Sequence, residues 1–499
     1  MNLLIEALPE NLGGHVIVTV VPLLLAVVIS VPLGILATRR PAVRGPLLGV
    51  IGVIQTVPGL ALLALMVPLL AWLDGALGDA VVVPVFGMLP ALVALTLYGM
   101  LPIARNTVAG IEGVDEGVVV AARGLGMTEG QILREVQLPL AAPVILAGVR
   151  TATVWCVGMA TLATPIGQTS LGNYIFAGLQ TRDLGSVVFG SVVAAALALV
   201  LDGLLAGIER GVARGARGLV MGCALGLVAV LGGGLGASLA RPPAEVTIGA
   251  KPFTEQYVLA HLLARRAEAA GLTASRREGL GSTVAFEALV AGQLDVYVEY
   301  TGTLWATALK RTDAADAQTV RREVCAWVER EHAARCLGAL GFANNYALAT
   351  KRELASIAEL AAVSADLTMG ADYEFFGRPE WEALRSAYGL RFAEQRTMDP
   401  TFLYDAVDRG DVDVIPAYTS DGRIAAFGLN VLEDTAQVLP PYDAIVLVSD
   451  AAPAALVDAL RPLIGALPVE AMREANRKVD ADGVAPEEAA AWLDGRVGG

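Results

Sequence analysis

The first 240 residues contain six long apolar stretches, and most of their charged residues lie in the short segments between these stretches. A helix needs about 20 mostly apolar residues to cross the hydrocarbon core of a bilayer. The pattern therefore predicts an all-α polytopic membrane domain with six transmembrane helices. The stretches lie near 14–37, 46–73, 80–104, 143–167, 185–208 and 218–240.

From residue 245 onward, short β-rich runs alternate with helical stretches. Examples of the runs are EVTIGAK at 245–251, VYVEY at 296–300 and VDVIPAY at 412–418. This alternation is typical of an α/β fold. Roughly 255 residues are enough for two lobes with a cleft between them, which is the usual concave site for a small ligand.

The chain is accordingly divided into three parts. We expect a membrane domain over 1–240 and an α/β domain over 248–499, joined by a linker over 241–247. The Gly and Pro residues in LGGGLGASLARPPAE, which ends the sixth stretch and enters the linker, suit a short tether between the two domains.

Arginines are concentrated in the segments that follow the first, third and fifth stretches. Short segments rich in Lys and Arg remain on the cytoplasmic side of a membrane. We therefore expect a multi-pass protein of the plasma (inner) membrane, with the N-terminus and the C-terminal α/β domain on the extracytoplasmic side. These arginines are Arg39, Arg40, Arg44, Arg105, Arg123, Arg134, Arg210, Arg214 and Arg217.

Two charged residues, Arg150 and Asp202, fall within the apolar stretches near their cytoplasmic ends. Charged side chains inside a membrane are costly and often functional. Near a helix end, however, a long side chain can extend its charge to the interface. We favour this second explanation for both residues.

The net formal charge is −1 for residues 1–240 and −13 for residues 241–499. The acidic second part lacks the basic surface that nucleic-acid binding requires, so no nucleic-acid partner is expected. A metal site is not expected either, because the four cysteines show no CxxC spacing.

Cys325 and Cys336 are the cysteines of the α/β domain, and an extracytoplasmic location would allow them to form a disulfide. Eleven residues of continuous helix would hold them about 16 Å apart. A disulfide between them therefore requires a helix that ends in the intervening segment.

The segment between the third and fourth stretches reads AARGLGMTEGQILREVQLP from Ala121 to Pro139. It resembles the coupling motif of binding-protein-dependent ABC importer permeases, which is Glu-Ala-Ala, three residues, Gly, nine residues, an apolar residue, any residue, then Leu-Pro. Val120 stands where the family usually has Glu. The matching positions are Ala121, Ala122, Gly126, Val136, Leu138 and Pro139.

The resemblance implies a type I ABC importer-like permease whose coupling loop, at 112–140, docks on a cytoplasmic ABC ATPase subunit. A small-residue pair followed by Gly allows a short helix to pack closely and turn sharply. We expect Pro139 to end this helical unit before the next span. The alternative is an interfacial helical hairpin without a partner.

None of the four lysines lies in a GxxxxGK[ST] phosphate-binding loop, so the chain itself is not expected to bind ATP or to be an enzyme. No cofactor is expected in this chain, and ATP and Mg would be used by the separate ATPase subunit. The resemblance also implies a homodimeric permease.

Several segments of the α/β domain resemble the binding proteins for glycine betaine, choline and related quaternary amines. The resemblance covers nearly all of 245–499 and implies a periplasmic-binding-protein-like (type II) clamp of two lobes. The matching segments are IGAKPFTEQY at 248–257, GLGSTVAFEALVAGQLDVYVEYTGT at 279–303, LGFANNYALA at 340–349, AYTSDGRI at 417–424 and LPPYDAI at 439–445.

In this family, tyrosines enclose the trimethylammonium group, and the matching residues here are Tyr300, Tyr346, Tyr418 and Tyr442. A quaternary ammonium has no N–H to donate, so ring faces and dispersion must recognise it. Ordinary packing in the core or on the surface is the alternative for these residues.

The other end of the ligand needs polar groups. Gln256, Thr303 and Asn345 lie inside the matching motifs and are our candidates. Ser282 and Thr283 precede an apparent helix whose free N–H groups could hold an anion. Helix capping explains these two residues equally well.

Together these features predict the permease and substrate-binding subunit of an ATP-driven importer for quaternary-ammonium compounds such as glycine betaine, choline or carnitine. An ergothioneine importer of the same architecture is an alternative, because ergothioneine is also a trimethylammonium betaine. A receptor that senses a quaternary amine without transporting it is an alternative of another class.

Overall fold

The computed structural model describes residues 4–5, 7–77, 84–181, 183–239, 244–311 and 315–497. The chain divides into two compact units, one formed by Met1–Phe176 with Gly185–Pro242 and the other by Ala177–Leu184 with Pro243–Gly499. Residues 241–243 of the predicted linker lie outside the described residues. The first strand begins at Val246, so the end of the predicted linker belongs to the α/β fold.

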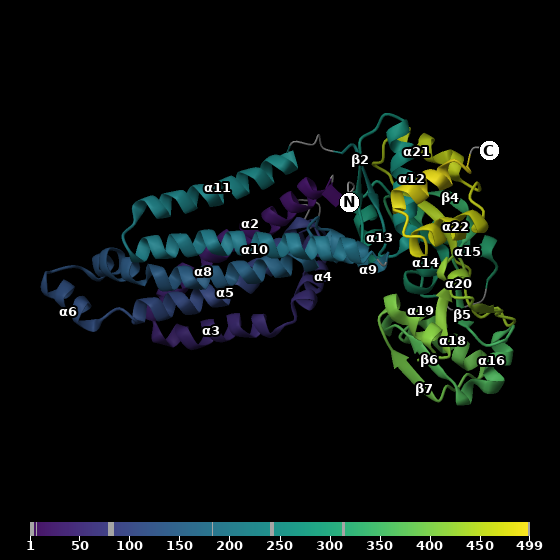
Figure 1. Ribbon diagram of the computed structural model, residues 1–499, viewed down its shortest axis with the longest axis horizontal. Coiled ribbons are helices and arrows are strands. Elements are labelled where there is room, and N and C mark those ends of the chain that lie inside the picture. The colour runs from purple at the N-terminus through teal and green to yellow at the C-terminus, as the bar shows by residue number, and fades with distance from the viewer. Residues whose placement is uncertain are drawn as a thin grey trace. The chain divides into compact units, whose positions relative to one another are not determined.

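The first part of the chain is helical (Figure 1). Its elements are α2 (Leu8–Arg39), α3 (Pro41–Thr56), α4 (Gly59–Leu77), α5 (Met88–Glu112), α6 (Glu116–Gly124), α7 (Glu129–Gln131), the π-helical η2 (Ile132–Gln137), α8 (Leu138–Ala160), the 3-10 helix η3 (Thr161–Ile166), α9 (Gly172–Gln180), α10 (Leu184–Ala213) and α11 (Arg217–Leu239).

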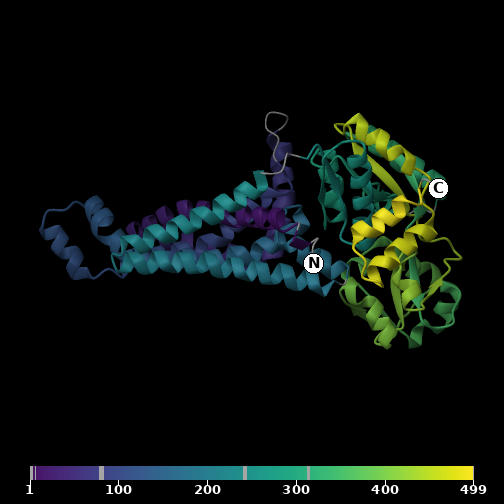
Figure 2. The same cartoon turned by 45° about the horizontal axis from the view of Figure 1, so that its top comes forward.

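Among the described residues, five helices are long and apolar enough to cross a membrane, or up to six if the bent pair α3 and α4 counts as one span. Helices α2, α5 and α8 pack closely on one another through small and β-branched side chains, and α11 packs against α2 (Figures 1 and 2). This agrees with the helical membrane-type domain predicted from the apolar stretches.

The second predicted span, near 46–73, is not straight. It is broken into α3 and α4, whose axes differ by 102°. Val57, at the break, has an extended backbone (φ −69°, ψ 127°). Pro58 follows it, and a proline disfavours helical geometry in the preceding residue and has no N–H to donate. The bend therefore follows from one X-Pro pair.

Arg150 and Asp202, whose charges we expect to extend to the interface, are paired with each other in the structure. The guanidinium of Arg150 on α8 donates to both carboxylate oxygens of Asp202 on α10, over 2.9 and 3.0 Å. It also donates to Glu209 over 2.7 Å. Each charge thus has an opposite charge beside it, which lowers the cost of placing both in an apolar bundle.

The second unit contains ten strands within its described residues. They are β1 (Val246–Gly249), β2 (Ala274–Arg277), β3 (Val296–Tyr300), β4 (Ala334–Ala343), β5 (Tyr346–Thr350), β6 (Thr368–Ala371), β7 (Glu394–Thr397), β8 (Val414–Tyr418), β9 (Asn430–Leu432) and β10 (Asp443–Ser449). The helices are α12 (Thr254–Ala269), α13 (Ser282–Val290), α14 (Thr301–Thr307), α15 (Ala317–Glu331), α16 (Ile357–Val363), η4 (Ser364–Asp366), α17 (Tyr373–Phe376), α18 (Pro379–Tyr388), α19 (Pro400–Arg409), α20 (Arg423–Ala426), α21 (Ala454–Leu460), η5 (Arg461–Leu463), α22 (Val469–Asp480) and α23 (Pro486–Asp494).

The strands form two five-stranded sheets within the part of the chain that the structure describes, in the orders β2-β1-β3-β10-β4 and β7-β6-β8-β5-β9. The first sheet belongs to lobe 1, which holds 244–311, 315–343 and 443–497, and the second belongs to lobe 2, which holds 346–432. The chain passes from lobe 1 to lobe 2 through Asn344 and Asn345, and it returns through the segment before β10. The α/β architecture predicted from the alternating pattern is confirmed.

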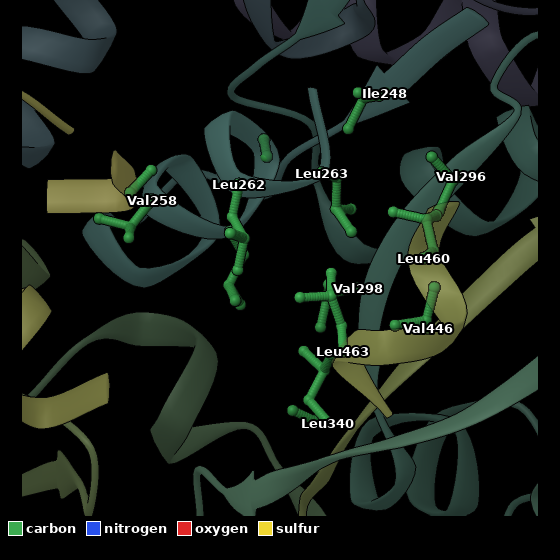
Figure 3. Packing of buried hydrophobic residues seen from close by; sticks show 14 of the residues in the cluster. Ile248, Val258, Leu262, Leu263, Val296, Val298, Leu340, Val446, Leu460 and Leu463 are labelled. Carbon is green, nitrogen blue, oxygen red and sulfur yellow. The ribbon is translucent and has the colours of Figure 1, made fainter. Parts of the chain in front are cut away.

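Each lobe has its own apolar core. In lobe 1, side chains from α12 pack against the faces of β1, β3 and β10 (Figure 3). Ile248, Val296 and Val446 are among the fully buried residues. Alternate residues of a strand point to the same face, so this core fixes which side chains of β3 point away from it.

Cys325 and Cys336 form a disulfide, and their Cα atoms are 5.3 Å apart. Helix α15 ends at Glu331 and β4 starts at Ala334, so the helix does end between the two cysteines, as a disulfide requires. The bond joins the last helical turns of α15 to the strand that leads into the first lobe crossing.

Candidate functional site

A cavity of about 690 Å³ lies between lobes 1 and 2. Tyr300 ends β3 and Tyr418 ends β8, whereas Tyr346 begins β5 and Tyr442 directly precedes β10. All four tyrosines line the cavity. They converge because the ends of these strands meet at the two lobe crossings, so residues far apart in sequence reach one site.

The rings form a continuous series. The ring centroid of Tyr346 lies 4.8 Å from that of Tyr418 and 5.2 Å from that of Tyr442, the latter pair at an interplanar angle of 78°. Phe253 is stacked on Tyr418 at 6.3 Å and lies 6.0 Å from Tyr300. We call these five side chains the aromatic cage.

The backbone at Gly302 packs directly against the ring of Tyr442, one of the cage residues. A Cβ atom at Gly302 would lie 2.7 Å from ring atoms of Tyr442. Only glycine leaves room for this ring, so the Gly in the motif YTGT supports the cage directly. The motif YTGT therefore supplies both a cage residue, Tyr300, and the glycine that makes room for the ring of Tyr442.

Phe253 is a cage residue that the sequence argument missed. It stands between Pro252 and the first residue of α12, within the segment IGAKPFTEQY that was already matched to the binding-protein family. An aromatic residue within a matched motif was the available signal. Because only tyrosines were carried over from the family, it was overlooked.

Tyr300 is held by buried polar groups beneath the cage. Its hydroxyl donates to Oε1 of Glu255 over 2.5 Å and accepts from Nε2 of Gln256 over 3.0 Å. Burial raises the pKa of Tyr300 well above its usual value, and the nearby Glu255 carboxylate adds to the effect. Tyr300 therefore stays neutral, with a fixed ring orientation.

Three basic residues, Lys251, Arg378 and Arg423, lie on the cavity wall, and Arg423 is paired with Asp421. Lys251 is almost fully buried and its Nζ is paired with Oε1 of Glu299. Burial lowers the pKa of Lys251, while Glu299 opposes that change. The guanidinium of Arg378 lies 5.2 Å from the ring centroid of Tyr346 and donates to Glu374 over 2.5 Å.

The predicted polar residues divide into two groups. Thr303 and Ser282 line the cavity. Gln256 and Asn345 do not, because their side chains have other partners: Gln256 donates to Tyr300 and to the carbonyl of Val298, and Asn345 accepts from the backbone N–H of Tyr442 over 2.8 Å. The adjacent Asn344 takes the place on the wall.

Thr283 is exposed and is not part of the cavity wall. The N-cap of α13 is Gly281, with no side-chain hydrogen bond, so Ser282 and Thr283 are the first residues of the helix and do not cap it. Ser282 reaches the cavity because it opens the helix, and Thr283 faces solvent because it lies about 100° further round the helix.

The predicted coupling segment forms a helical hairpin. Asp115 caps α6 by accepting from the N–H groups of Gly117 and Val118. The chain then turns at Gly126, whose φ is +83°, a value that L side chains rarely adopt. A capping box between Thr128 and Gln131 restarts the helix.

The surface of this hairpin is partly apolar. Leu125 is 84% exposed and Val120 is 56% exposed. Ala121 and Gly126 are also exposed, while Ala122 is buried. An exposed apolar tip on an ordered, capped helix fits a docking surface better than a solvated loop.

Pro139 does not end the hairpin, contrary to our expectation. It lies in the first turn of α8, directly after the π-helical turn η2 that contains Val136, and one helix runs continuously from Glu129 to Ile166. The wide turn accommodates a residue that lacks an N–H, so the helix continues through Leu138 and Pro139 into the span.

Glu129 joins this hairpin to the end of α2. Its carboxylate accepts from Arg123 over 2.7 Å and from Arg39 over 2.9 Å. The start of the long helix that contains α8 is thus tied both to α6 and to the first span.

A family model for the substrate-binding domain of ABC-type glycine betaine transport systems matches residues 244–494, and another for the inner membrane component of binding-protein-dependent transport systems matches residues 30–214. The chain belongs to these transport families. The expected combination of a permease and a binding domain in one chain is confirmed. The curated relatives are likewise named as permeases and binding proteins.

Two curated relatives show how the match is distributed. The ergothioneine transport permease/ergothioneine binding protein of Helicobacter pylori is 29% identical over 85% of this chain and 78% of its own length. The choline transport system permease protein of Bacillus subtilis is 42% identical over 38% of this chain and 80% of its own length. A solved glycine betaine/carnitine/choline ABC transporter structure is 28% identical, with a TM-score of 0.45, over 50% of this chain and 97% of that one.

Proposed function

We propose that this chain is the permease and substrate-binding subunit of an ATP-driven importer that takes up quaternary-ammonium compounds. The aromatic cage carries this proposal. A trimethylammonium group is recognised by ring faces, each contributing about 0.5–2 kcal/mol when desolvated. Five rings line one cavity here.

The cage also explains how binding would drive closure. Tyr300 comes from lobe 1, whereas Tyr346 and Tyr418 come from lobe 2. A cation placed among these rings attracts both lobes, so occupancy favours the closed arrangement. The closed lobes would then present the ligand to the membrane unit.

The cavity wall also contains polar and charged groups that could bind the part of the ligand beyond its ammonium head. Lys251 and Arg378 provide positive charge, and Thr303 provides a hydroxyl. A ligand carboxylate would complement these groups. This favours betaines, namely glycine betaine, carnitine and ergothioneine, over choline, which has no carboxylate. Ergothioneine is the specific second candidate, because a relative that aligns with 85% of this chain is named for it.

The helical hairpin that contains α6 provides a surface on which a partner subunit could dock. We assign the exposed tip formed by Val120, Ala121, Leu125 and Gly126 to docking on a cytoplasmic ATPase subunit, which would bind ATP and Mg. Two copies of this chain would form the permease. The arginine pattern supports a cytoplasmic hairpin and an extracytoplasmic N-terminus and binding domain.

Uptake in reconstituted vesicles tests this function. The full chain and its ATPase subunit, captured from cells of the native host through a tag on this chain, would be reconstituted into liposomes. Vesicles should accumulate at least one labelled quaternary amine only when ATP is supplied on the ATPase side. A receptor that senses without transport would bind the amine but show no ATP-dependent accumulation.

A further inference from the structure

Glu255 is a buried carboxylate on the wall of the cavity. It lies in the first turn of α12, is 3% exposed, and lines the site next to Tyr300. Its Oε1 accepts from the Tyr300 hydroxyl over 2.5 Å and from Nδ2 of Asn344 over 3.1 Å. Its Oε2 accepts from Nδ2 of Asn476 over 3.0 Å.

The environment of Glu255 differs from that of the other buried carboxylates around the cavity. Glu299 is paired with Lys251, and Asp421 is paired with Arg423 over 2.7 Å. Among the described residues, Glu255 accepts hydrogen bonds from the uncharged side chains of Tyr300, Asn344 and Asn476. A buried carboxylate held only by neutral donors retains a large part of its desolvation cost, and a nearby cation would offset that cost.

We propose that Glu255 is the counter-charge for the cationic head of the ligand and that it acts through the hydroxyl of Tyr300. This inference rests on the proposed function and names the residue that makes the cage selective for charge as well as shape. Glu255 is a positioning and electrostatic residue here, since Tyr300 stands between it and the cage.

Two physical effects support this assignment. A hydroxyl that donates a short bond to a carboxylate becomes more electron-rich, as does its ring, and this strengthens the attraction of the ring face for a cation. The carboxylate also attracts the cation directly, and a site that excludes water screens that attraction weakly.

The pKa of Glu255 fits this assignment. Burial raises it, and the hydrogen bonds from Tyr300 and Asn476 oppose the rise. A cation nearby would favour the ionised carboxylate. Binding and ionisation of Glu255 would therefore support each other.

The test compares a cationic ligand with a neutral ligand of the same shape. The full chain in nanodiscs would be titrated with the quaternary amine that it binds most tightly and with the tert-butyl analogue, in which carbon replaces the ammonium nitrogen. The readout is the ratio of the two Kd values. Glu255→Gln keeps the size of the side chain and an acceptor for Tyr300 but removes the charge.

We expect Glu255→Gln to lower the preference for the cation by about tenfold while the Kd of the tert-butyl analogue changes little. Tyr300→Phe should lower the same ratio, and adding Glu255→Gln to Tyr300→Phe should lower it by less than tenfold. Tyr257→Phe, which removes a buried hydroxyl outside the cavity wall, is the control and should leave the ratio unchanged.

An equal loss of affinity for both ligands in Glu255→Gln would show a purely structural role and would overturn the proposal, as would an unchanged ratio. If Glu255→Gln does not fold, as judged by thermal unfolding, Tyr300→Phe decides by the same criterion. Failure of the wild-type chain to bind any quaternary amine would instead overturn the proposed function, so the two failures are distinguishable.

Discussion

The hydroxyl of Tyr418 donates to the hydroxyl of Tyr346 over 2.9 Å, and the two ring centroids are 4.8 Å apart. The residues are direct partners in the antiparallel ladder between β5 and β8. The strand register itself thus holds two walls of the cage together. A slip of one residue would move one of the rings to the other face of the sheet.

Because this pair is fixed by the backbone, removing one ring should act on the ligand more than on the fold. We expect Tyr346→Ala to weaken binding of each quaternary amine by about three- to thirtyfold, which corresponds to one cation–π contact. Tyr346→Phe keeps the ring and should retain most of the affinity. Calorimetric titration of both variants checks this, and an unchanged Kd in Tyr346→Ala would remove Tyr346 from the site.

Arg378 offers a prediction about ligand choice. Its guanidinium lies 5.2 Å from the centre of the Tyr346 ring, and its partners include Glu374 and Glu380. Arg378→Gln should weaken betaines that carry a carboxylate by about tenfold, because a charged hydrogen bond is lost. Choline should bind as well as before or more tightly, since the nearby glutamates lose their counter-charge. Competition binding between glycine betaine and choline measures this shift, and equal weakening of both ligands would contradict it.

A substitution at Gly126 should affect transport but not ligand binding. Its φ of +83° makes any side chain there strained, although a Cβ would meet no atom within 4 Å. Gly126→Ala should therefore distort the tip of the hairpin, at a cost of about 1 kcal/mol, and reduce ATP-dependent uptake without changing the ligand Kd.

Gly124→Ala is the matched control for that variant. Gly124 also has open space around the Cβ position, but its φ is not positive, and it lies within α6. Uptake should be preserved. A loss of uptake in Gly124→Ala comparable to that in Gly126→Ala would show that the effect does not come from the turn geometry.

The disulfide predicts a stability difference within the binding domain. Cys325 and Cys336 are eleven residues apart, and closing a loop of that length stabilises a fold by about 3 kcal/mol in the chain-entropy account. Reduction, or the double variant Cys325→Ser with Cys336→Ser, should lower the unfolding midpoint of this domain. Neither cysteine lines the cavity, so the ligand Kd should not change. An unchanged midpoint under reducing conditions would contradict this.

Much of the architecture could be predicted from the sequence, because helices and strands depend on the pattern of neighbouring residues. Apolar length located the spans, and alternation of short runs located strands such as β3 and β8. The break at Val57 is different: Pro58 was visible, but its effect depends on whether neighbouring helices straighten or accept the bend. Pro139 shows the converse, because a wide turn allowed the helix to continue.

The site could be predicted only in part. Family motifs brought in four tyrosines from separate segments, and all four line one cavity. The motifs could not tell Asn344 from Asn345, because which of two adjacent amides faces the cavity depends on how the lobe crossing twists. Arg378 lies outside every matched motif, so its contact with Tyr346 became visible only in the folded lobe. Glu255 lay within a motif, but its hydrogen-bond donors come from distant segments, so only the folded structure shows that they are uncharged.

The central claim is that the tyrosine-walled cavity binds a quaternary ammonium. Isothermal titration calorimetry of the full chain in nanodiscs with glycine betaine, choline, carnitine and ergothioneine tests it most directly. We expect at least one of them to bind with a Kd well below about 1 mM, equivalent to about −4 kcal/mol, and we expect Tyr346→Ala to weaken this binding. If none of the four binds more tightly than that threshold, the cavity is not a quaternary-ammonium site.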